Sequence, residues 1–237
     1  MHEHGHQPPQ GAEGLAVSAE KILKNYVVGE QTLPVLHELD LSIAPGEAVA
    51  ILGVSGTGKS TLLNILGGLD QADAGSIVVA GVDLRSCGTG QLARFRAERI
   101  AFVFQFYNLI SNLTAFENVL AGLQASRRTT QADTQNVRDA LRSVGLAKKA
   151  DTFIGALSGG EQQRVAIARA LIKRAPIILA DEPTGNLDRS TAKAIVKLLV
   201  STTRDRGTAV VVVSHDPSIV NSVDKAYRLE NGRLIPG

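Results

Sequence analysis

Short apolar stretches and stretches with helical periodicity alternate along most of the chain. Continuously apolar runs occupy residues 48–52, 100–104 and 177–180, and a strand over 208–213 is apolar after Thr208. Such runs are typical of strands that are buried on both faces, as in a parallel sheet. Apolar residues at helical spacing follow them and predict helices over 61–66 and 190–206. The alternation predicts an α/β fold whose helices pack on the sheet.

Other stretches alternate between apolar and polar residues, which is typical of strands with one buried face. Residues 15–26 and 35–43 show this alternation. Residues 76–79 and 81–84 predict a small hairpin, and a second hairpin is expected at 225–234, turning at Asn231-Gly232. We therefore expect an antiparallel β subdomain beside the parallel core.

The segment from about 106 to 158 has a different pattern, which predicts an all-helical subdomain inserted into the core. Thr114 and Glu117 form a capping-box pattern ahead of a helix over 118–124. Residues 127–135 are polar and predict a loop, whereas 136–144 predict a helix that Gly145 ends at its C′ position. The core is then expected to comprise residues 15–105 and 159–237.

Composition narrows the class of protein. The 237 residues are 44% hydrophobic, enough for one core with a subdomain, and the net charge of +2 is scattered without a basic block. We therefore expect no nucleic-acid partner. The single cysteine, Cys87, excludes an internal disulfide and suits a reducing cytosol. No signal-peptide pattern opens the sequence and no apolar run approaches the ~20 residues of a membrane span, so a membrane role is expected to act through a partner.

Residues 1–14 carry alternate histidines, prolines and glycines and predict a disordered tail. His2, His4 and His6 are spaced for weak metal binding, but a solvated tail is the interpretation that the pattern favours. A single domain is thus expected over 15–237.

The stretch Gly53-Val54-Ser55-Gly56-Thr57-Gly58-Lys59-Ser60 fits the phosphate-binding pattern G-x-x-x-x-G-K-[ST]. A predicted strand precedes it and a predicted helix follows it, which disfavours an accidental glycine-rich turn. Glycines let successive N–H groups curl toward an anion, and the helix N-terminus adds partial positive charge. Lys59 adds a full charge for the β/γ-phosphates of ATP, and the Ser60 hydroxyl is a ligand for Mg²⁺. The expected nucleotide-binding residues here are Gly53, Ser55, Gly56, Thr57, Gly58, Lys59, Ser60 and Thr61.

Polar side chains follow three of the predicted core strands, where ligands collect in α/β sheets. Asp181 ends one strand and is expected to hold Mg²⁺, while Glu182 is the candidate to polarise the attacking water. Gln105 follows another strand, from which its amide would reach Mg²⁺ or that water. His215 follows a third strand. On its own it would be interpreted as a hydrogen-bonded histidine in a turn, but because Lys59, Gln105 and Asp181 also lie at strand ends, we expect it to contact phosphate.

A second anion site is predicted at Leu157-Ser158-Gly159-Gly160-Glu161. Ser158 and Glu161 form a capping-box pattern, so a well-capped helix is the simpler interpretation. That cap does not require two glycines, which let another surface approach the bare N–H groups of the helix tip. Because the first glycine-rich stretch already accounts for one nucleotide, a second site implies another ligand or another molecule.

Tyr26 lies shortly before the second alternating strand. An aromatic ring there is placed to stack on the adenine base, and packing on the core is an equally good interpretation of the spacing.

Together these stretches resemble the nucleotide-binding subunit of an ATP-binding cassette (ABC) transporter over nearly the whole chain after Gly14. The resemblance implies the ABC ATPase fold and favours the adenine-stacking role of Tyr26. It also implies a role for each motif: Walker A at 53–60, the Q-loop at Gln105, the signature at 157–161, Walker B at 177–181 with catalytic Glu182, the D-loop at Asp188 and the switch histidine at His215. The amino-acid sequence of residues 63–70 and 180–188 resembles that of the group which contains lipoprotein-releasing, macrolide-efflux and cell-division ATPases.

The resemblance further implies that two copies pair head to tail, so that Ser158, Gly159 and Gly160 of one copy close on the γ-phosphate held by Lys59 of the other. ATP hydrolysis would then drive integral membrane permease subunits from the cytoplasmic side of the membrane, for export or extraction of lipid, lipoprotein, drug or peptide. A non-transport ATPase that regulates a membrane partner in cell-wall remodelling or cell division is the alternative. The resemblance also implies that the cargo-contacting surface belongs to the permease.

Overall fold

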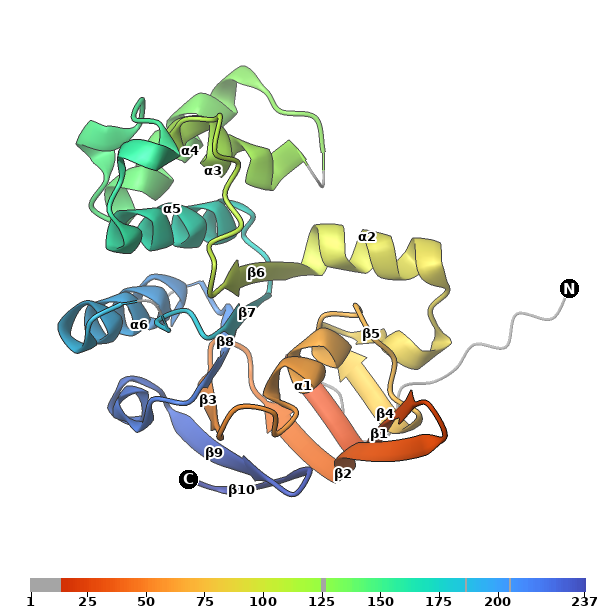
Figure 1. The fold of residues 1–237 in the computed structure, drawn as a ribbon. Coiled ribbons are helices and arrows are strands. Elements are labelled where there is room, and N and C mark those ends of the chain that lie inside the picture. Colours follow the sequence, from red (N-terminus) through yellow and green to blue (C-terminus); the bar gives the residue numbers. More distant parts are fainter. Residues whose placement is uncertain (1–13, 125–126, 186, 205) are drawn as a thin grey trace, which may run out of the picture.

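The computed structural model describes residues 14–124, 127–185, 187–204 and 206–237. The tail predicted over residues 1–14 therefore lies outside the described residues, except for Gly14. Two sheets and a layer of helices make up the described part of the chain (Figure 1).

The larger sheet has six strands in the order β10-β9-β3-β8-β7-β6. Five of them run parallel, and β10 pairs antiparallel with β9 as the closing hairpin predicts. The strands are β3 (Ala48–Leu52), β6 (Ile100–Phe104), β7 (Ile177–Asp181), β8 (Ala209–Ser214), β9 (Lys225–Glu230) and β10 (Arg233–Pro236). Because the chain crosses over through helices between parallel strands, the carboxyl ends of β3, β6, β7 and β8 meet at one edge.

This sheet separates two hydrophobic cores, since successive side chains of a strand point to opposite faces. In β7, Ile177 and Leu179 pack in one core and Ile178 and Ala180 in the other. The first core also contains helix α1 (Lys59–Leu66) and the smaller sheet, whereas the second contains α5 (Gly159–Ile172) and α6 (Arg189–Arg204). Burial on both faces explains the continuously apolar runs in the sequence.

The smaller sheet is antiparallel, with the order β2-β1-β4-β5. Its strands are β1 (Val17–Val28), β2 (Gln31–Ile43), β4 (Ala74–Val79) and β5 (Val82–Asp83), and the predicted hairpin is the β4–β5 pair. The register of β1 and β2 shifts between Ala19 and Ile22, and Lys21 there has a φ of 51°. A 3₁₀ turn (Leu84–Ser86) and α2 (Thr89–Arg99) return the chain to β6.

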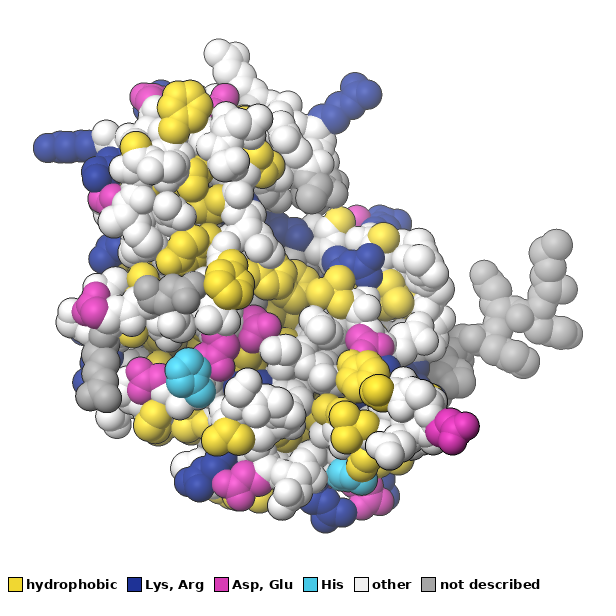
Figure 2. Space-filling model, viewed as in Figure 1, with side chains coloured by type: hydrophobic (Ala, Val, Ile, Leu, Met, Phe, Trp, Pro, Cys, Tyr) yellow, Lys and Arg dark blue, Asp and Glu magenta, His cyan; other side chains and the backbone are white. Residues whose placement is uncertain are grey.

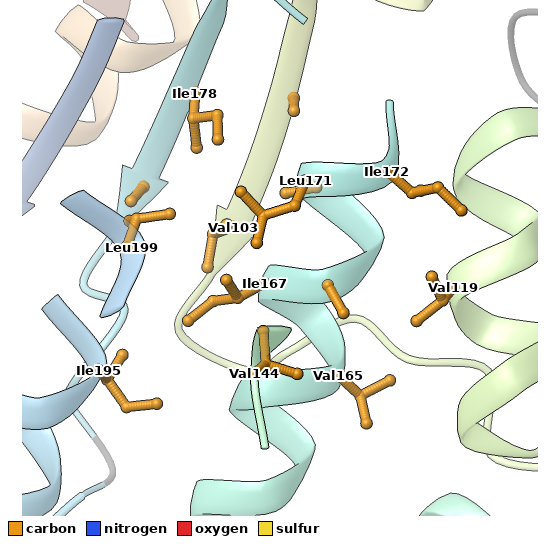
Figure 3. Close-up of a cluster of buried hydrophobic side chains, with 14 of the residues drawn as sticks. Val103, Val119, Val144, Val165, Ile167, Leu171, Ile172, Ile178, Ile195 and Leu199 are labelled. Atoms are coloured by element: carbon orange, nitrogen blue, oxygen red, sulfur yellow. The ribbon is translucent and has the colours of Figure 1, made fainter. Parts of the chain in front are cut away.

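Helices α3 (Ala115–Gln124) and α4 (Gln131–Ser143) lie in the segment for which an all-helical insertion is predicted. Figure 3 shows α5 between α3 on one side and α6 and the strands on the other, with Ile167 and Leu171 turned toward Val103. Helix α5 thus packs on both the inserted helices and the sheet, and the boundary proposed at residue 158 stays a prediction. Three short 3₁₀ turns complete the described chain: Ala147–Lys149, Ile154–Ala156 and Pro217–Ser222.

The prediction of a loop over 127–135 is wrong in part, because α4 begins at Gln131. Asp133 explains the early start: its Oδ2 accepts a hydrogen bond from Thr130 N at 2.6 Å, and its two oxygens bind the Arg127 guanidinium at 2.6 and 2.9 Å. A polar first turn with its own cap looks like a loop in the sequence. The predicted end of this helix is confirmed, since Gly145 has a φ of 77°.

In the part of the chain that the structure describes, no helix combines the length and apolar character needed to cross a membrane.

Asn118 fastens the segment before α3 to that helix. Its side chain is fully buried; Oδ1 accepts from Ile110 N at 2.8 Å, and Nδ2 donates to Ile110 O and Thr114 O, both at 3.0 Å. We expect Asn118→Ala to lower the free energy of unfolding by about 2–4 kcal/mol, because buried backbone groups lose their partners. Urea denaturation measures the change. Gln124→Ala on the exposed side of the same helix is the control, expected to shift stability by less than about 0.5 kcal/mol; an equal effect of the two variants would contradict the prediction.

Candidate nucleotide-binding site

The turn between β3 and α1 has the conformation that a phosphate cradle requires. Gly56 and Gly58 have φ values of 83° and 100°, a region that residues with a Cβ rarely adopt. A Cβ on Gly58 would also lie 2.8 Å from Val35 Cγ1. The glycines are therefore needed for the turn that brings the chain into the N-terminus of α1 at the edge of the sheet.

Lys59 is the buried cation of this turn, with only 6% of its surface exposed. Its Nζ donates to the carbonyl oxygens of Gly53 at 2.7 Å and Val54 at 2.9 Å, and lies 3.7 Å from Glu182 Oε1. The ammonium group is thus held inside the loop by partial and full negative charges. A phosphate at the cradle would meet it without a long side-chain movement.

Ser60 and Asp181 bring a hydroxyl and a carboxylate to one point, with Ser60 Oγ donating to Asp181 Oδ1 at 3.2 Å. Burial raises the pKa of Asp181 and the neighbouring Glu182 charge adds to the rise, against the opposing effects of the Ser60 hydrogen bond and of Lys59. Mg²⁺ prefers hard oxygen ligands and completes its shell with water and phosphate. The donor set of Ser60 and Asp181 fits that ion.

Glu182 and His215 form a pair beside this point. His215 Nδ1 lies 2.9 Å from Glu182 Oε2, and the same oxygen accepts a hydrogen bond from His215 N at 3.3 Å. Glu182 has a φ of 44°, a left-handed conformation that is costly for a side chain of this kind and that clusters at functional sites. Its backbone N–H donates to Val213 O at 3.0 Å, which ties the turn after β7 to β8.

These residues line one open cleft at the carboxyl edge of the sheet. Gln105 also lines it, and its amide packs so closely on Gly185 that a Cβ there would lie 2.8 Å from Nε2. Figure 2 shows acidic side chains gathered beside a histidine near the centre of this face. The residues lining the cleft are Val35, Val54, Ser55, Gly56, Gly58, Lys59, Ser60, Thr61, Gln105, Asp181, Glu182 and His215. Gly53 and Thr57 line an adjoining hollow together with His215.

Ser158, Gly159 and Gly160 do not belong to the described residues that line the cleft. Ser158 caps α5 as the sequence predicts: its Oγ accepts from Glu161 N at 3.4 Å, and its N–H donates to Glu161 Oε2 at 3.0 Å. A Cβ on Gly159 would lie 3.0 Å from the Tyr107 hydroxyl, and one on Gly160 would lie 3.2 Å from Thr191 Cγ2. The N-terminal tip of α5 therefore lies beside Tyr107 and Thr191 and not beside the glycine-rich turn.

Tyr26 and Asp188 also lie outside the lining of the cleft. The Tyr26 hydroxyl donates to Asp70 Oδ2 at 2.7 Å. Asp188 Oδ1 accepts from Ser190 Oγ at 2.6 Å and from Thr191 N at 3.1 Å, and these bonds hold the pKa of Asp188 well below its usual range. No local sequence pattern indicates Asp70, because Tyr26, the residue that it binds, lies 44 residues away.

The site combines a glycine cradle around a buried lysine with a hydroxyl–carboxylate pair and a glutamate in a left-handed conformation. This combination at the carboxyl edge of a parallel sheet defines a P-loop nucleotide-binding protein. Comparison with known proteins narrows this class, because the family model described as ABC transporter matches residues 36–185. The chain belongs to the ABC transporter family and is its ATP-binding, ATP-hydrolysing subunit.

Curated relatives match over more than nine-tenths of both chains. The chain is 44% identical over 223 residues to the lipoprotein-releasing system ATP-binding protein LolD of Bordetella pertussis, covering 94% of this chain and 96% of the relative. It is 41% identical to LolD of Chromohalobacter salexigens, with 93% of each chain covered.

Solved structures confirm the expected ABC ATPase fold. The ATP-binding cassette MJ0796, a dimer in a post-hydrolysis state bound to ADP and Pi, superposes with a TM-score of 0.82 at 38% identity and 92% and 96% coverage. The protein cbiO1 of Clostridium perfringens, part of the ABC transporter complex cbiONQ, has a TM-score of 0.84 at 28% identity, with 94% of this chain and 88% of that chain covered.

Lys59→Ala tests the cradle. We expect ATP affinity to fall at least about tenfold, because a charge-assisted contact to phosphate is lost. Isothermal titration calorimetry measures the change, with Lys148→Ala, an exposed lysine in a 3₁₀ turn, as the control that keeps normal affinity. Unchanged ATP binding by Lys59→Ala would refute this assignment.

Proposed function

We propose that this chain is the ATPase of a membrane complex that releases lipoproteins, and that two copies enclose ATP between them. The proposal that the cargo is a lipoprotein rests on relatives named as lipoprotein-releasing ATP-binding proteins, which match over more than nine-tenths of both chains. Export of a drug or peptide is the other cargo assignment that the sequence allows.

The separation of the two halves of the predicted site supports pairing of two copies. The cleft supplies the cradle, the magnesium ligands and Glu182, whereas the helix tip at Ser158–Gly160 does not line it. That tip has the free N–H groups and the positive dipole end that bind an anion. Head-to-tail pairing would bring the tip of one copy onto the phosphate in the cleft of the other, and the related cassette MJ0796 is a dimer.

Hydrolysis then follows from positioning and charge. Lys59 binds the β- and γ-phosphates, and the loop glycines present N–H groups to the same oxygens. Mg²⁺, held by Ser60 and Asp181 with Gln105 close by, would neutralise phosphate charge when bound with ATP. We assign Glu182 to accept a proton from water as the water oxygen bonds to the γ-phosphorus and the bond to the leaving ADP oxygen breaks. His215, fixed by its contact with Glu182, is placed to hold the γ-phosphate.

A membrane partner is expected to contact the segment that follows Gln105. Phe106 is 73% exposed and Ile110 is 47% exposed, although both are large apolar residues. Asn118 and Arg169 fix the backbone of this segment to α3 and α5. Contact with a permease here would place the chain at the cytoplasmic face of the membrane and link the cleft to the partner through Gln105.

Glu182→Gln tests the catalytic assignment. We expect ATP binding to persist and turnover to fall at least about 100-fold, because the amide cannot accept the proton. ATP should then hold the variant as a dimer, which light scattering coupled to size-exclusion chromatography detects, whereas ADP should leave it monomeric. Hydrolysis at the wild-type rate would show that Glu182 is not the base.

Reconstitution tests the cargo. The membrane protein that co-purifies with this chain is placed in vesicles together with a lipoprotein, and release of the lipoprotein is followed after ATP is added. We expect release with the wild-type chain and none with Glu182→Gln. ATP hydrolysis without release would contradict the lipoprotein proposal, leave the ATPase assignment intact and favour a regulatory role.

A further inference from the structure

The aromatic ring of Tyr26 is held in place by side chains distant in the sequence. Its hydroxyl donates to Asp70 Oδ2 at 2.7 Å, across 44 residues. The ring is therefore fixed at its polar edge by a residue that follows α1, although 36% of Tyr26 remains exposed.

Lys24 occupies the position next to one face of this ring. Its Nζ lies 5.0 Å from the ring centroid and donates to Asp70 Oδ1 at 2.7 Å and to Gln71 O at 2.8 Å. Only 8% of Lys24 is exposed, so the ammonium group is held between carboxylate, carbonyl and ring. The two oxygens of Asp70 thus bind the two residues separately, one to Lys24 and one to Tyr26.

The fold explains why these groups meet. Lys24 and Tyr26 are two residues apart on β1, and the Lys24 ammonium group lies over the Tyr26 ring. Asp70 follows α1, and its backbone N–H donates to Asn64 O on that helix at 3.2 Å. Burial opposes the charge on Asp70, but hydrogen bonds from Lys24 and Tyr26 outweigh it and keep the pKa of this carboxyl below its usual value. Asp70 therefore links the phosphate-binding helix to the strand that carries the aromatic ring.

We propose that Asp70 is a positioning residue for the nucleotide base: it fixes the edge of the Tyr26 ring while Lys24 occupies one face, so that the base stacks on the other. This inference rests on the proposed nucleotide site, because it requires the triphosphate to lie in the cradle. Fixing the ring before the ligand arrives lowers the entropy lost on binding. The base would gain affinity without discrimination between purines, since stacking tolerates any base.

The test compares ATP with inorganic tripolyphosphate, which has the phosphates but no base. We expect Asp70→Ala in the full-length chain to weaken ATP binding about tenfold and to leave tripolyphosphate binding unchanged. Tyr26→Ala should give at least the same selective loss, because stacking on an aromatic ring is worth about 5- to 150-fold in affinity. Tyr26→Phe keeps the ring and loses the hydroxyl, so it should fall between wild type and Tyr26→Ala. The ratio of the two affinities within one variant is insensitive to the folded fraction.

Asp40→Asn is the matched control. Asp40 is exposed and also binds β1, since its Oδ1 accepts from Lys21 N at 2.8 Å. Its affinity ratio should equal that of wild type. If Asp70→Ala lowers the affinities for ATP and tripolyphosphate equally, Asp70 has only a structural role. If Tyr26→Ala leaves the ATP affinity unchanged, the base does not stack on this ring. Either result overturns the inference. A wild-type chain that binds neither ligand would instead refute the nucleotide site itself.

Discussion

The buried ammonium group of Lys59 is the interaction on which the site depends. Two loop carbonyls at 2.7 and 2.9 Å and the Glu182 carboxylate at 3.7 Å surround it. A buried cation needs such partners, and they fix the loop around it. The same arrangement brings the end of β7 against the start of α1, which places Asp181 next to Ser60. The residues proposed to bind phosphate, hold Mg²⁺ and activate water are thus arranged around one charge.

The sheet holds this arrangement because it is packed on both faces. Alternate residues of β3, β7 and β8 enter two separate cores, so the strand ends that carry the polar residues cannot shift without disturbing both. The core on one side anchors α1, and the core on the other anchors α5 and the inserted helices. The cradle and the helix tip at Ser158 therefore belong to helices on opposite faces of the sheet, as expected if the two act in different copies.

The sequence predicted the elements whose signals are local. The glycine-rich turn, the apolar strands and the capping boxes at Thr114 and Ser158 depend on residues within a few positions of one another, and all of them are confirmed. The start of α4 was missed, because the Asp133 carboxylate that organises it looks like a loop residue. The contacts of Asp70 with Lys24 and Tyr26, and of Gln105 with Gly185, join residues far apart in the chain, so that only the fold reveals them.

We propose that the cradle of one copy and the diglycine helix tip of another enclose the nucleotide. Chains with Ser55→Cys and chains with Ser158→Cys, both also carrying Cys87→Ser and Glu182→Gln, are mixed and oxidised with ATP, with ADP and without nucleotide. Enclosure of this kind predicts a disulfide between the two kinds of chain that forms with ATP and not with ADP. Absence of that disulfide at ATP concentrations that saturate both chains would contradict it.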